Sequence, residues 1–125
     1  MHKRQQLNQT KEAIQFFSNA VRIKPRNVSG WEALIRCLYQ SEFYAEARQQ
    51  VLNAMDITNN KPVFLFYLSA VLLAQGKTKE ALLYLENAMQ TSPKTLKKFI
   101  DLNPSILQNA NVVDVIARYK KSKRR

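Results

Sequence analysis

The nine residues 80–88, Glu-Ala-Leu-Leu-Tyr-Leu-Glu-Asn-Ala, decide the fold of this chain, because two similar segments precede them at equal spacing. Residues 46–54 read EARQQVLNA and residues 12–20 read EAIQFFSNA, so each step is 34 positions. Glutamate, alanine, a large apolar residue, asparagine and alanine hold the same places in all three segments. An internal repeat of this length indicates an array of similar helical units.

Each segment lies within an apolar pattern of helical period. One face of a helix over residues 10–24 collects Ala13, Phe16, Phe17, Ala20 and Val21. Thr10 is the predicted N-cap of this helix and Pro25 its predicted end. The same signals predict further helical segments over residues 28–40, 45–57, 62–75, 78–90, 96–102, 104–107 and 112–119. The predicted fold class is therefore all-α.

Composition agrees with a helical domain. The chain has 125 residues, of which 46% are hydrophobic, so it can bury a core within one domain. Its 2 glycines and 4 prolines are too few for a turn-rich all-β protein. Cys37 is the only cysteine and falls in an apolar helical pattern, which favours a buried structural thiol over a reactive one.

The net charge of +11 is unevenly placed along the chain. Residues 94–125 hold nine lysines or arginines against two aspartates, which leaves the preceding residues close to balanced. No apolar run is long enough to span a bilayer, and the basic first residues lead into no apolar segment of the kind found in signal peptides. The sequence leaves the compartment open, with the cytoplasm favoured.

Helix–turn–helix units of this period resemble the tetratricopeptide repeat (TPR) family. The first-helix aromatic position of that family holds Trp31, Leu65 and Phe99, and its leucine position holds Leu34, Leu68 and Leu102. The second-helix pattern of alanine, large residue and alanine is Ala13-Phe17-Ala20, Ala47-Val51-Ala54 and Ala81-Leu85-Ala88. The chain departs from the family at the glycine that follows the leucine, where it has Ile35, Ser69 and Asn103.

The resemblance implies a right-handed antiparallel α-helical solenoid with a C-terminal capping helix, in one domain spanning 1–125. On this register 10–25 is the second helix of a truncated repeat, 28–60 and 62–93 are repeats, and 94–125 is an irregular helical cap with a basic tail. We expect the unpaired second helix to expose Phe16 and Phe17. We therefore interpret the chain as the C-terminal part of a longer array, or as one whose N-terminal face is covered by a second copy. Its ending is similar to those of TPR proteins of Bacteroidetes-type bacteria.

Residues with catalytic or metal-binding spacing are scarce in the sequence. His2 is the only histidine, no Cys/His cluster has metal-ligand spacing, and two glycines cannot form a phosphate-binding loop. We expect neither enzymatic activity nor a cofactor.

The TPR resemblance implies that function lies in the concave groove lined by first helices. The corresponding residues here are Glu32, Arg36, Tyr39, Val63, Phe66, Tyr67, Ala70 and Leu73. The groove lacks the Lys, Asn and Arg with which chaperone-binding TPRs hold a terminal carboxylate. We expect a protein–protein interaction module, within a larger scaffold protein, that takes an apolar peptide or helix on anchors such as Phe66 and Tyr67. Alternatively, these side chains pack against the C-terminal segment or a second copy.

A competing hypothesis assigns function to the basic C-terminal segment. Its cations would contact phosphates of nucleic acid or an anionic surface: Lys94, Lys97, Lys98, Arg118, Lys120, Lys121 and Lys123. No aromatic residues alternate with these charges to stack on bases, so this hypothesis ranks second.

Overall fold

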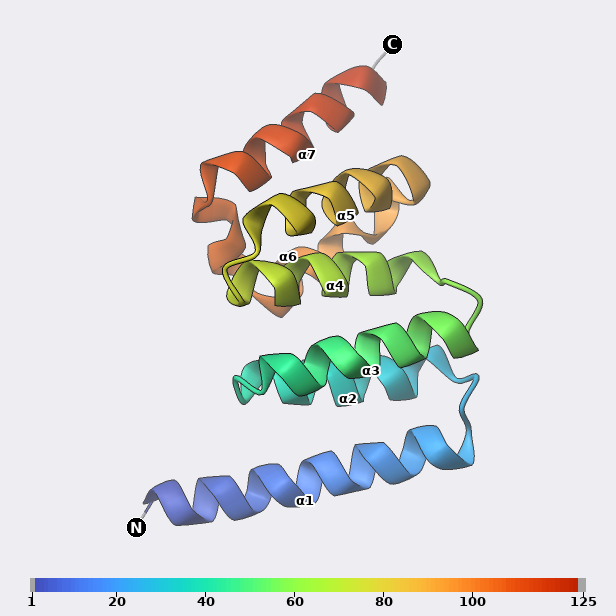
Figure 1. The fold of residues 1–125 in the computed structure, drawn as a ribbon, viewed down its shortest axis with the longest axis vertical. Coiled ribbons are helices and arrows are strands. Elements are labelled where there is room, and N and C mark those ends of the chain that lie inside the picture. The colour runs from blue at the N-terminus through green and yellow to red at the C-terminus, as the bar shows by residue number, and fades with distance from the viewer. Residues whose placement is uncertain (1, 124–125) are drawn as a thin grey trace. The chain divides into compact units, whose positions relative to one another are not determined.

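The structure, a computed structural model, describes the backbone of residues 2–123 and the side chains of residues 7–120. Within that range the chain forms seven α-helices and two short 3-10 helices, packed mostly with their neighbours in sequence (Figure 1). No helix of residues 2–123 has the length and hydropathy needed to cross a membrane. The chain divides into two compact units, Met1–Asn60 and Lys61–Arg125, here called unit 1 and unit 2.

Unit 1 contains α1 (His2–Ile23), α2 (Val28–Gln40) and α3 (Tyr44–Ile57), and α2 packs against both of the others. The predicted N-cap at Thr10 was wrong, because α1 begins at His2 and runs through that residue. The reason is local, since the segment before Thr10 is rich in Lys, Arg, Gln and Leu, which favour helix, and lacks any helix breaker.

The connection between α1 and α2 is held by two side chains. Asn27 caps α2, with its Oδ1 accepting a hydrogen bond from the Ser29 N–H at 3.1 Å. The Trp31 indole Nε1–H donates to the Pro25 carbonyl at 2.6 Å. This hydrogen bond therefore links Trp31, the first-helix aromatic residue of one repeat, to Pro25, which follows the end of α1. Trp31 lies in the unit 1 core with Leu34, Ile35 and Leu38.

Unit 2 contains α4 (Pro62–Ala74), α5 (Thr78–Thr91), α6 (Leu96–Leu102) and α7 (Ala110–Lys123), with 3-10 turns η1 (Pro93–Thr95) and η2 (Pro104–Gln108). α4 packs against α5 and α6, and α7 packs against α5. The buried Ser69 hydroxyl of α4 donates to the Ala81 carbonyl of α5 at 2.7 Å. A small residue at each position lets the two helices approach closely.

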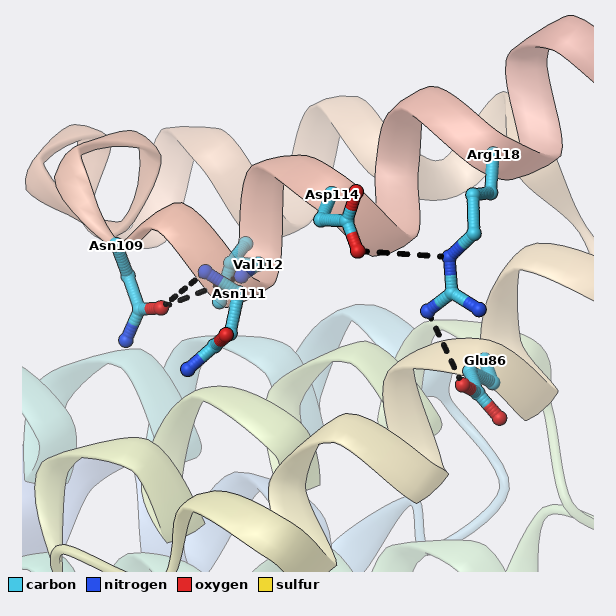
Figure 2. Close-up of polar contacts among 6 residues, drawn as sticks. All are labelled: Glu86, Asn109, Asn111, Val112, Asp114 and Arg118. Atoms are coloured by element: carbon cyan, nitrogen blue, oxygen red, sulfur yellow. Dashed lines mark hydrogen bonds and ion pairs between the residues drawn. The ribbon is translucent and has the colours of Figure 1, made fainter.

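The last helix begins earlier than its apolar pattern indicates. Asn109 Oδ1 accepts hydrogen bonds from the N–H groups of Asn111 at 2.9 Å and Val112 at 3.2 Å (Figure 2). This cap lets α7 start at Ala110, whereas the sequence placed a break at residues 109–111. Among the side chains of α7 that the structure describes, those of Val112, Val115 and Ile116 are buried.

The turns after α2 and α4 have the same backbone geometry but different residues. After α4, Gly76 has φ 78°, and the N–H groups of Gly76 and Lys77 donate to Leu73 at 3.0 Å and Leu72 at 2.9 Å. After α2, Glu42 has φ 64° and takes the equivalent place in the same hydrogen-bond pattern. Both turns are Schellman motifs, which favour glycine at the left-handed position.

Replacing Glu42 by glycine is expected to stabilise the protein by about 0.5–1 kcal/mol, because the left-handed conformation strains a residue with a Cβ. Gly76→Ala is expected to destabilise it by about 1 kcal/mol for the same reason. A Cβ at residue 76 would meet no heavy atom within 4 Å, so that cost comes from the backbone alone. Urea denaturation measures both changes. The control Glu42→Ala keeps the strain, and an equal gain from it would contradict this explanation.

Candidate functional site

The predicted groove residues are largely inaccessible in the structure. Tyr39, Val63, Phe66, Tyr67 and Ala70 are buried, whereas Glu32, Arg36 and Leu73 are partly exposed. Phe66 and Tyr67, the expected anchors, are each 0% exposed. A peptide could reach these two side chains only by displacing the residues that cover them, and their role as anchors stays a prediction.

Phe66 is covered by other residues of unit 2. Its ring lies 5.9 Å from that of Phe99 in α6, which packs against α4. Phe99 is itself 0% exposed, so the two rings form part of the unit 2 core. This contact with the C-terminal segment is the alternative that the sequence left open for the residue.

The basic residues of the C-terminal segment are divided between helices. Lys94 in η1 and Lys97 and Lys98 in α6 are exposed, and α6 packs against α4. Arg118 and Lys120 are exposed on α7, which packs against α5. Lys121 and Lys123 lie outside the described side chains.

Arg118 is engaged with two carboxylates. Its Nη2 lies 3.5 Å from Glu86 Oε1 on α5, and its Nε lies 3.7 Å from Asp114 Oδ2 on α7 (Figure 2). Such exposed ion pairs contribute about 0–1 kcal/mol each, but they orient the guanidinium toward acidic groups. Arg118 is therefore a weak candidate for phosphate binding. Among the residues with described side chains, no three His, Cys, Asp or Glu lie close enough together to hold a metal ion.

Large apolar side chains are exposed on α1. Phe16 is 68% exposed and Ile23 is 71% exposed. Together with three partly exposed neighbours at helical spacing they form what we call the α1 surface: Ala13, Phe16, Phe17, Ala20 and Ile23. The rings of Phe16 and Phe17 meet edge to face at 5.4 Å. This surface lies beside the contact with α2, which is made by the buried Val21 facing Gly30.

The internal repeat supplies a comparison for the α1 surface. The residues equivalent to Ala13, Phe17 and Ala20 are each 0% exposed in both other copies, namely Ala47, Val51 and Ala54 of α3 and Ala81, Leu85 and Ala88 of α5. In those copies the helix packs against the one that precedes it, α2 for α3 and α4 for α5. In α1 the same three positions are only partly buried. Three of the five positions of the α1 surface are therefore covered in the other copies. The equivalents of Phe16 are partly exposed there, and those of Ile23 are exposed.

A cleft of about 560 Å³ opens between α1 and the end of α2. This α1–α2 cleft is lined by Leu7, Gln9, Thr10, Ala13, Cys37, Gln40, Ser41 and Phe43, and it shares Ala13 with the α1 surface. No lining residue is charged. The sequence did not indicate the cleft, because it arises where α1 continues N-terminal to Thr10.

Polar contacts and burial define the chemistry of the cleft wall. The Ser41 hydroxyl donates to the Cys37 carbonyl at 2.8 Å, so that hydroxyl is engaged in the end of α2. Cys37 is a free thiol at intermediate exposure, and burial raises its pKa above the ordinary value of 9.0. The thiol is therefore less reactive at neutral pH than an exposed one, because only the thiolate is nucleophilic. The cleft offers a neutral, mostly apolar environment.

Cations gather where α1 ends. Arg22, Lys24 and Arg26 are exposed where the chain turns toward α2. Arg22 Nη2 donates to Asn19 Oδ1 at 2.9 Å, which holds that side chain along the helix. Nine residues after Ala13, Arg22 lies on the opposite side of α1, so this arginine is not part of the α1 surface.

Comparison with known proteins adds no assignment. No protein-family model matches the chain, and no curated protein is similar to it.

Proposed function

We propose that this chain is a non-catalytic protein-binding module of TPR-like architecture, and that the α1 surface binds its partner. The carrying observation is the exposure of Phe16 and Ile23, at 68% and 71%, beside three partly exposed positions whose equivalents in the two other copies are fully buried. Burying a phenylalanine or isoleucine side chain contributes about 1.5–3 kcal/mol. A partner that covers both side chains would therefore gain a large part of its binding free energy from them. The TPR-like assignment is supported by the 34-residue repeat.

Two features favour this surface over the alternatives. Four of the five groove positions on α4 are buried and only Leu73 is partly exposed, so α4 offers a partner little contact in this conformation. The basic residues lie on η1, α6 and α7, and Arg118 is already paired with carboxylates. On α1, two large apolar side chains, Phe16 and Ile23, are exposed on the helix that also lines the cleft.

Photocrosslinking through residue 16 tests the proposed function. A photoreactive phenylalanine analogue replaces Phe16 in the full chain, which is exposed to extract of the source cells. The control carries it at Leu83, which is 66% exposed on α5 in unit 2. We expect a protein crosslinked through residue 16 and not through residue 83. That protein is then purified and titrated against the unmodified chain.

Titration of the purified partner against variants of the chain tests whether the α1 surface binds it. We expect Phe16→Asp to weaken binding of the purified partner at least about tenfold, because a charge would enter an apolar contact. Leu83→Asp should leave the affinity unchanged. Equal affinities for the Phe16→Asp and unmodified chains, or equal losses in both variants, would overturn the proposal.

A further inference from the structure

We draw no further inference here: the strongest candidate, the α1–α2 cleft beside Cys37 together with the apolar α1 surface that adjoins it, belongs to the site already described, and nothing in the structure shows what covers it.

Discussion

Phe66→Ala is expected to lower the free energy of unfolding by about 3–5 kcal/mol, one of the largest losses for a single substitution in this chain. The Phe66 side chain is 0% exposed and its ring meets Phe99 at 5.9 Å, so its removal leaves a cavity in the unit 2 core. Chemical denaturation followed by circular dichroism measures the loss.

Phe16→Ala is the matched control, because the same side chain is removed where it is 68% exposed. We expect a loss below about 1 kcal/mol, from the edge-to-face contact with Phe17. Comparing the two variants separates the stability contributed by a buried phenylalanine from that contributed by an exposed one. A small loss from Phe66→Ala would restore that residue as a candidate groove anchor.

Trp31→Ala is expected to destabilise unit 1 by about 3–5 kcal/mol. The indole is 4% exposed and its N–H bonds the Pro25 carbonyl at 2.6 Å, so it both fills the core and ties the α1–α2 connection. Because Trp31 is the only tryptophan, unfolding must be followed by circular dichroism rather than by its fluorescence.

Trp31→Phe separates the two contributions of the indole. Phenylalanine keeps most of the apolar contacts but cannot donate to Pro25, so we expect a loss of about 1–2 kcal/mol. Equal losses in the alanine and phenylalanine variants would show that the hydrogen bond, rather than packing, dominates. Unfolding of Trp31→Ala within about 1 kcal/mol of the unmodified chain would contradict the core assignment.

Most helix positions were predictable because local signals define them. Pro62 starts α4, Gly76 takes the left-handed turn after it, and the 34-residue register aligned the buried alanines of α3 and α5. The start of α1 was misplaced, because Thr10 reads as a cap while the residues before it also favour helix.

The candidate site was predictable only in part. Exposure of Phe16 and Phe17 was expected from the repeat register. Phe16 is exposed in the structure, whereas Phe17 is only partly exposed. The α1–α2 cleft was not expected from the sequence. It depends on how far α1 extends along α2, which is a matter of helix packing.

The sequence by itself determined the helical class, the repeat period and the buried alanines that recur in α3 and α5. These follow from periodicity and end signals, which act over a few residues. The tertiary structure alone decided that Phe66 lies in the core of unit 2, because the ring that packs on it, Phe99, is 33 positions away and belongs to a different helix. It also decided the cleft beside Cys37, since a cavity is a property of two surfaces that meet incompletely.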